Sequence, residues 1–165
     1  IFFEDQKSKI FYFGGFINYN TGSLYINKKE TNNQKDEIEC DWTGGMGVVF
    51  PVSVFGNVGL IDNNNFPQYY GDADFSLRAS NFGYKIFCHS KLKLYNDRKL
   101  TGFYHEGSIK KYFNSLKSLR SPYNLKIHIR FAFKHFFIIQ AILFILQKHL
   151  MYISQLIYRK NKLNK

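Results

Sequence analysis

Two carboxylates, Asp72 and Asp74, are the residues of this sequence whose type and spacing could do chemistry. They stand two positions apart at the start of an amphipathic segment that continues to Gly83. Acidic side chains at the start of a helix can act as a general base, bind a metal ion or cap the helix. Only the first two of these roles are chemical. The elements that position the two acids are therefore needed to distinguish among the roles.

Strand and helix signals alternate around the acids. A β-branched and aromatic run over residues 9–19, broken by a glycine pair, predicts a strand that enters a tight turn. Residues 20–39 are polar and predict a surface loop. A short helix over 52–58 and two strands between residues 84 and 95 follow. This alternation predicts an α/β layer rather than a helical bundle or a sandwich.

The charge is unevenly divided along the chain. Residues 1–97 carry nine Lys and Arg against eleven Asp and Glu, so 9 − 11 = −2, whereas residues 98–165 carry fourteen against one, so 14 − 1 = +13. We therefore expect an α/β domain over residues 1–97, followed by a basic amphipathic helical extension over residues 98–165. A cationic, aromatic extension suits an anionic surface.

The extension favours a lipid surface over nucleic acid. Its most apolar portion, residues 136–146, is eleven residues long and interrupted by Gln140 alone, which is shorter than the ~20 apolar residues of a bilayer span. Basic residues flank this portion, as expected of a helix lying in the membrane interface. The aromatic residues gather in the apolar stretch instead of interleaving with the basic ones, so we expect no nucleic-acid partner. A helix that packs on another polypeptide is the alternative.

The two cysteines, Cys40 and Cys88, lie far apart and fit no zinc spacing. A disulfide framework is not expected, and a reduced cytoplasmic setting is the default. The five histidines do not cluster at metal or triad spacing, and we expect them at the surface or at interfaces.

Four motifs follow one another in an informative order. They are Trp42-Thr43-Gly44-Gly45 with Met46, then residues 54–62, then Tyr70-Gly71-Asp72-Ala73-Asp74-Phe75-Ser76-Leu77-Arg78-Ala79, and finally Gly83-Tyr84-Lys85-Ile86. This order resembles the C-terminal half of a family-2 glycosyltransferase of the GT-A fold, in particular the bacterial rhamnosyltransferase-like members. The resemblance covers residues 9–97 closely and implies a partial GT-A-like mixed sheet with flanking helices.

The resemblance implies roles for five of these residues. Asp72 matches the acid that acts as general base in an inverting transfer of sugar from a nucleotide-sugar donor. Trp42 is expected to form a wall for the sugar or the acceptor, and Gly44 and Gly45 to shape the backbone beside the donor sugar. For Asp74, acceptor binding and a structural role as helix-start residue paired with Arg78 are both open.

The sequence departs from the family pattern in three places. Gly71 replaces a frequent Glu, which we do not interpret as inactivating. Asn96 replaces a His that helps to hold the metal diphosphate; Asn is a poorer transition-metal ligand, so we assign no metal ligand here. The nucleotide-binding half with its Asp-x-Asp motif is missing, and the start at Ile1 without Met indicates a chain truncated at its front. The complete enzyme is expected to use Mg²⁺ or Mn²⁺, and this chain alone to be inactive.

These observations lead to two functional hypotheses. The first is a glycosyltransferase that acts on a glycan or a lipid-linked acceptor in polysaccharide or cell-envelope synthesis, peripheral to the inner face of the plasma membrane. The second is a non-catalytic membrane-surface binding module that keeps the acceptor side of the fold. The sequence specifies neither the donor sugar, nor the acceptor, nor the oligomeric state.

Overall fold

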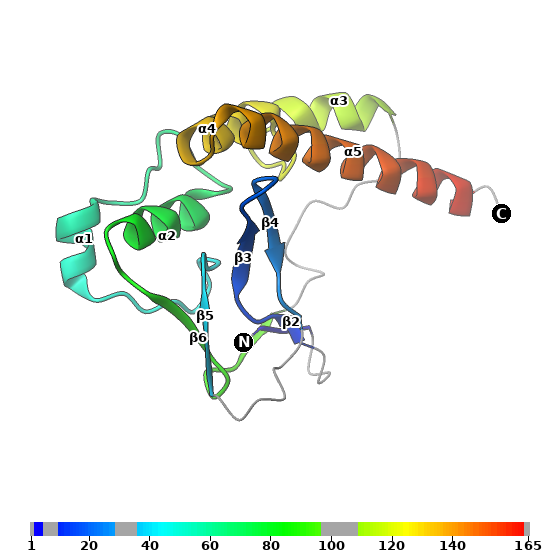
Figure 1. Cartoon of the computed structure of the whole chain (residues 1–165). Coiled ribbons are helices and arrows are strands. Elements are labelled where there is room, and N and C mark those ends of the chain that lie inside the picture. The colour runs from blue at the N-terminus through cyan, green and yellow to red at the C-terminus, as the bar shows by residue number, and fades with distance from the viewer. Residues whose placement is uncertain (1, 5–9, 29–35, 97–108, 164–165) are drawn as a thin grey trace. The chain divides into compact units, whose positions relative to one another are not determined.

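The structure is a computed structural model that describes residues 2–4, 10–28, 36–96 and 109–163. It combines helices with small sheets, as the α/β class requires (Figure 1). The chain divides into two compact units. Unit 1 comprises Ile1–Asn18, Leu24–Asp62 and Gly71–Gly102, and unit 2 comprises Tyr19–Ser23, Asn63–Tyr70 and Phe103–Lys165.

The strands are short and form three small sheets. A three-stranded sheet has the order β2-β1-β7, in which β1 pairs antiparallel with β2 and parallel with β7. A hairpin joins β3 to β4, and β5 pairs antiparallel with β6. The strands are β1 (Phe2–Glu4), β2 (Ile10–Tyr12), β3 (Gly15–Asn18), β4 (Ser23–Ile26), β5 (Glu37–Cys40), β6 (Ile86–His89) and β7 (Leu94–Asn96).

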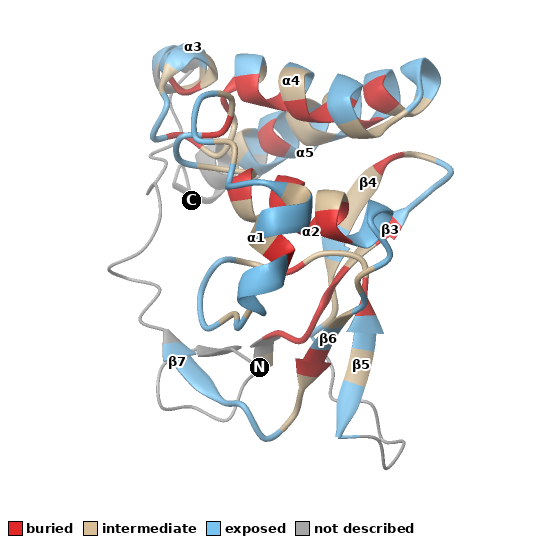
Figure 2. Cartoon of the chain, turned by 90° about the vertical axis from the view of Figure 1, so that its left-hand side faces the viewer, coloured by how far each residue is buried: buried red, intermediate tan, exposed pale blue. Residues whose placement is uncertain are grey.

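Unit 1 contains two helices, α1 (Val52–Val58) and α2 (Gly71–Asn81). Helix α1 follows Pro51 and ends at Gly59, whose φ of 82° favours glycine, so the predicted helix over 52–58 is confirmed. Phe75 of α2 is buried and packs with Val54 and Ala79 in one core cluster. Figure 2 shows the buried positions of α2 in red, and they extend over most of the helix.

The loop predicted for residues 20–39 is wrong in part. Strand β4 and strand β5 both lie in this region, while residues 29–35 fall outside the described residues. Each strand is only four residues long and stands among polar residues, so its formation depends on pairing with a neighbour. The backbone N–H of Phe13 donates to Asn27 O at 2.8 Å, and Asn27 N–H donates to Gly14 O at 3.0 Å, which continues the pairing beyond β4.

Unit 2 is helical and contains α3 (Ile109–Lys117), α4 (Leu125–His135) and α5 (Ile138–Leu163). Asn124 caps α4, accepting a hydrogen bond from Ile127 N–H at 3.0 Å. Side chains of α5 bind the β3–β4 turn: Gln140 donates to Tyr19 O, and Ser23 donates to Gln147 Oε1. Within the described part of the chain, no helix has the length and apolarity that a membrane crossing would need.

A histidine pair lies inside unit 2, which corrects the expectation that His128 is a surface residue. His128 is 1 % exposed, and its Nε2 lies 2.9 Å from Pro122 O. Its Nδ1 lies 3.2 Å from His149 Nε2. Because a carbonyl only accepts, Nε2 of His128 carries the proton in the neutral ring, and His149 then donates to Nδ1. The pair therefore suits two neutral imidazoles.

This pair makes the stability of unit 2 fall in acid. Burial, followed by the neighbouring His149, lowers the pKa of His128 from 6.5 to about 4. The unfolded chain binds this proton more readily, so the stabilisation is complete above pH 6.5 and is lost as the pH falls towards 4. The loss amounts to about 3 kcal/mol. Urea unfolding followed by far-UV circular dichroism should show it, and His128→Gln should flatten the profile; an unchanged profile in that variant would refute the assignment.

Candidate active site at the start of helix α2

Helix α2 begins directly after a residue in an uncommon backbone conformation. Tyr70 has a φ of 69°, and among the described residues no other non-glycine has a positive φ. This conformation costs roughly 1–2 kcal/mol for a residue with a side chain. Aromatic packing within unit 2 offsets it, since the Tyr70 ring lies 4.7 Å from that of Phe131 and 6.1 Å from that of Phe144. Side-chain packing, rather than local preference, therefore holds the turn before α2.

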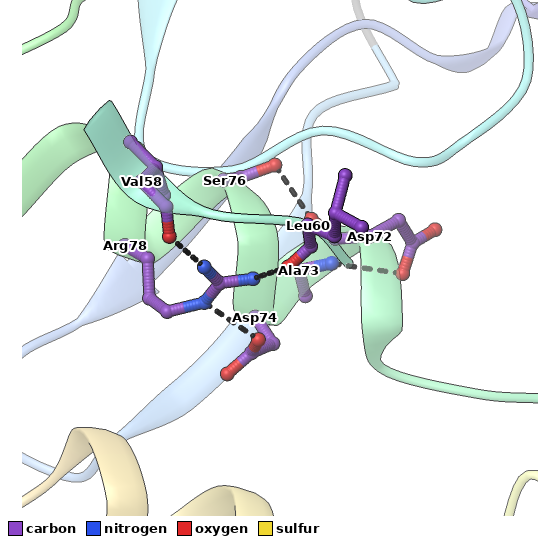
Figure 3. Close-up of polar contacts among 7 residues, drawn as sticks. All are labelled: Val58, Leu60, Asp72, Ala73, Asp74, Ser76 and Arg78. Atoms are coloured by element: carbon purple, nitrogen blue, oxygen red, sulfur yellow. Dashed lines mark hydrogen bonds and ion pairs between the residues drawn. The ribbon is translucent and has the colours of Figure 1, made fainter. Parts of the chain in front are cut away.

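Asp72 is the second residue of α2, and its side chain is partly exposed. Its Oδ2 accepts a hydrogen bond from Gly45 N–H at 2.8 Å. Its Oδ1 accepts one from Ala73 N–H at 2.8 Å, which Figure 3 shows. Each carboxylate oxygen has two lone pairs, so each keeps one for a proton or a ligand. The arrangement is that of a fixed and accessible proton acceptor.

The glycine loop, residues 42–45, is fastened to α2 through its backbone. Thr43 N–H donates to Ser76 Oγ at 3.2 Å, and Ser76 Oγ–H donates to Asp72 O at 2.7 Å. Gly44 N–H donates to the hydroxyl of Tyr12 at 3.3 Å. Burial raises the pKa of this phenol well above its ordinary value, so it stays protonated and can donate as well as accept. The loop is thus fixed before any ligand binds.

Tyr12, Thr43 and Ser76 are site residues that sequence reasoning missed. Ser76 stands four positions after Asp72 and so lies on the same face of the helix, a spacing that could have drawn attention to it. Tyr12 and Thr43 carried no such signal, because the contacts of Tyr12 with the glycine loop and of Thr43 with Ser76 span 30 to 33 positions of the chain.

Trp42, the first residue of the glycine loop, forms a β-bridge with Gly15 at the start of β3. Its Nε1–H donates to Phe16 O at 3.2 Å, and its carbonyl accepts from the Tyr12 hydroxyl at 3.0 Å. The indole covers Gly15 so closely that a Cβ there would lie 2.3 Å from the ring, a position that only glycine can fill. These contacts give Trp42 a structural role. Since the side chain is only partly buried, its predicted contact with sugar or acceptor stays a prediction.

Gly44 and Gly45 face the carboxylate of Asp72. A Cβ built on either residue would lie 3.7–3.8 Å from atoms of Asp72, an ordinary contact distance. Neither residue has the positive φ that would require glycine. Their small size therefore keeps the space in front of the carboxylate open, instead of relieving a clash.

Asp74 faces the other way and lies in an ion pair. Its side chain is fully buried, and its Oδ2 accepts from Arg78 Nε at 2.9 Å (Figure 3). The guanidinium also donates to Val58 O at 2.5 Å and to Leu60 O at 2.8 Å. Arg78 thereby binds the carbonyls at the end of α1, where a cation is favourable. This placement favours the structural role of Asp74 over acceptor binding.

No metal site forms around these acids. Within the ranges that the structure describes, no three His, Cys, Asp or Glu side chains come together to hold a metal ion. Asn96 is the last residue of β7 and pairs with Glu4 of β1; its side chain lies outside the described part. The residues present do not fit the expected Mg²⁺ or Mn²⁺, so we derive no step through a metal.

A cavity of about 250 Å³ borders the glycine loop. Its lining includes Thr43 and Met46 from the loop region, Val54 of α1 and Tyr84 after α2. Asp72 is not among its lining residues. The cavity is therefore separate from the proton acceptor, and we assign the reacting groups to the open face in front of Asp72.

The two cysteines lie together in unit 1, although the sequence separates them by 48 positions. Cys40 of β5 and Cys88 of β6 are both buried and free, and their sulfur atoms are 3.9 Å apart. The hydrogen bond between the sulfurs raises the pKa of Cys40, with burial adding to the effect, and lowers the pKa of Cys88.

We expect oxidised glutathione to convert this pair into a disulfide. The Cys88 thiolate attacks glutathione disulfide and releases one glutathione, and Cys40 then displaces the second. Mass spectrometry of the unreduced chain should show a Cys40–Cys88 linkage and the loss of two hydrogens. Cys40→Ser should stop at the mixed disulfide. Recovery of two unmodified thiols after prolonged oxidation would contradict the geometry.

No protein-family model, curated protein or solved structure matches this chain.

Proposed function

We propose that unit 1 is the acceptor-side part of an inverting glycosyltransferase of the GT-A type, similar to the family-2 rhamnosyltransferase-like enzymes. The observation that carries the proposal is the 2.8 Å hydrogen bond from Gly45 N–H to Asp72 Oδ2. It joins two of the four motifs, 27 positions apart in the chain, into one site. That is the arrangement a shared catalytic role requires.

The proposed reaction is a direct displacement. Asp72 takes the proton of an acceptor hydroxyl while the hydroxyl oxygen forms a bond to the anomeric carbon of the donor sugar. The bond between that carbon and the diphosphate breaks, and the nucleoside diphosphate leaves with the electron pair. A base on the acceptor side gives inversion at the anomeric carbon, because the attack comes from the face opposite the leaving group.

The chain's own residues position the base and keep its front open. Gly45 and Ala73 hold the two carboxylate oxygens, and the small residues Gly44 and Gly45 leave room for the acceptor. Donor binding and the divalent cation are assigned by the resemblance to a nucleotide-binding half outside residues 1–165. A glycan or lipid-linked acceptor, at the cytoplasmic face of the membrane, fits the basic helices of unit 2.

The natural polypeptide that contains this chain tests the proposal. It should release nucleoside diphosphate from one member of a panel of nucleotide sugars when a cell-envelope glycan acceptor is added. Binding of a nucleotide sugar, measured by calorimetry, is the companion readout. If the folded natural polypeptide bound no nucleotide sugar, the transferase proposal would fail.

The second candidate is a membrane-surface binding module without catalysis. The specific observation in its favour is that the described part of unit 2 contains no Asp or Glu. Membrane binding without donor binding by the natural polypeptide would favour it over the transferase.

A further inference from the structure

Helix α5 has an unpartnered apolar stripe. Seven aliphatic residues recur along it at spacings of 0, 3, 4, 7, 11, 14 and 18 positions, which is one face of an α-helix. Their exposed fractions range from 38 to 74 %. These stripe residues are Ile139, Ile142, Leu143, Leu146, Leu150, Ile153 and Ile157.

The opposite face of α5 is the buried one. Ala141, Phe144 and Tyr152 are almost fully buried. Phe144 packs against Phe131 of α4, with ring centroids 5.8 Å apart. The helix therefore has its core contacts already, and among the described residues the stripe is a second apolar face that stays largely exposed. Exposed apolar surface of this extent marks an interaction site.

A basic groove lies between α3 and α4 of the same unit. It encloses about 700 Å³ and is open to solvent. Three cations, Lys117, Lys126 and Arg130, line it beside apolar residues such as Leu119 and Ile129. A groove that combines cations with aliphatic walls matches the phosphate and the adjoining glycerol and acyl carbons of a phospholipid.

Within the described part of unit 2, the basic residues have no acidic counterpart. From Ile109 to Lys165 the sequence holds twelve Lys and Arg and no Asp or Glu. The two other described segments of the unit, Tyr19–Ser23 and Asn63–Tyr70, hold no acid either. Most of the counter-charge therefore has to come from outside the unit, and an anionic surface supplies it.

We propose that unit 2 binds an anionic phospholipid surface, with the α5 stripe in the interface and lipid phosphates at the α3–α4 groove. Burying aliphatic side chains contributes a non-directional part of the binding free energy. Each cation near the surface adds an electrostatic part. The stripe contains no aromatic residue on which bases could stack, which disfavours single-stranded nucleic acid. This inference does not depend on the transferase activity.

Vesicle flotation with the full 165-residue chain tests the proposal. The chain should bind vesicles of phosphatidylglycerol mixed with phosphatidylcholine and should bind phosphatidylcholine vesicles much more weakly. Added salt should weaken the first interaction, because it screens the charges. Equal binding to both vesicle types, or none to either, would overturn the proposal.

Substitutions in the stripe test the apolar contribution. Leu146→Gln combined with Leu150→Gln should lower the partition coefficient by at least about tenfold, since both side chains lose their apolar burial. Ser154→Gln is the matched control on the same helix, because Ser154 is exposed and polar, and it should bind as the parent does. Circular dichroism checks that α5 is retained. If the double variant bound normally, the stripe would not be the docking face.

Substitutions in the groove test the charge contribution. Lys126→Gln and Arg130→Gln should each lower binding to the anionic vesicles about fivefold at low salt. Lys28→Gln, an exposed position of unit 1, is the control and should have no effect. Sedimentation and single-strand binding complete the test. A dimer abolished by the stripe variant, or tighter binding to single strands than to anionic vesicles, would each overturn the lipid assignment.

Discussion

Replacement of Asp72 by Asn should lower sugar transfer by the natural polypeptide about 10²–10⁴-fold, the usual contribution of a general base. Asn can still accept the hydrogen bond from Gly45 N–H, but its amide cannot take the proton of an acceptor hydroxyl. The loss should therefore lie in turnover, with donor affinity unchanged. Initial rates of nucleoside diphosphate release at saturating donor measure it.

Asp36→Asn is the matched control for this experiment. Asp36 is exposed and forms a surface ion pair with Lys91, so the same chemical change there should leave the rate within about twofold, as expected for exposed pairs. Fluorescence of Trp42, the single tryptophan, reports whether unit 1 stays folded. An Asp72→Asn variant that is folded and fully active would remove Asp72 from the mechanism.

Replacement of Arg78 by Ala should destabilise unit 1 by about 3 kcal/mol or more. The change leaves the fully buried carboxylate of Asp74 without its ion-pair partner, and breaking a buried pair from one side typically costs about 3–5 kcal/mol. It also frees the carbonyls of Val58 and Leu60 at the end of α1. Urea unfolding followed through Trp42 fluorescence measures the loss.

Lys85→Ala provides the comparison for Arg78→Ala. Lys85 pairs with Glu39 at 3.3 Å, but both side chains are more than half exposed, so this variant should lose less than about 1 kcal/mol. The free energy of unfolding of Arg78→Lys should lie between those of the two variants, because the charge is kept while the planar set of guanidinium donors is lost. Equal stability of the Arg78→Ala and Lys85→Ala variants would contradict a stabilising role for the buried ion pair of Asp74 and Arg78.

Local signals in the sequence were sufficient for the helices around the site. Pro51 and Gly59 mark both ends of α1, and Gly83 follows the end of α2, because proline and glycine act through their own backbone. The pair of Asp74 and Arg78 was predictable for a similar reason, since four residues is one helical turn. The full burial of Asp74 was not, because burial depends on elements elsewhere in the chain.

Contacts between distant segments could not be predicted from the sequence. Cys40 and Cys88 meet because β5 pairs with β6 in a register that places Cys40 opposite Ile86 and Ile38 opposite Cys88, and nothing in either strand alone fixes that register. The Tyr12 hydroxyl reaches the glycine loop for the same reason. The burial of His128 could not be predicted from the sequence either, because a histidine in a basic helix is typical of a surface position. Only its partners in the folded unit show that it is buried.

The sequence predicted the helical region in outline, but it did not predict which face of α5 is buried. An apolar portion at residues 136–146 indicated an interfacial helix, whereas α5 extends to Leu163 and carries separate buried and exposed apolar stripes. Both stripes are apolar, the exposed one aliphatic and the buried one partly aromatic, so hydrophobicity alone cannot tell which of them packs on α4. Packing decides this, and packing is a property of the folded unit.

The anomeric configuration of the transferred sugar tests whether Asp72 is the base of a one-step inverting transfer. With the natural polypeptide, a nucleotide-sugar donor of known configuration and a glycan acceptor, the product linkage can be assigned by nuclear magnetic resonance. A single product of inverted configuration is expected, because Asp72 activates an acceptor oxygen that displaces the diphosphate in one step. A product with retained configuration, or no transfer from any donor by a folded polypeptide, would contradict this role of Asp72.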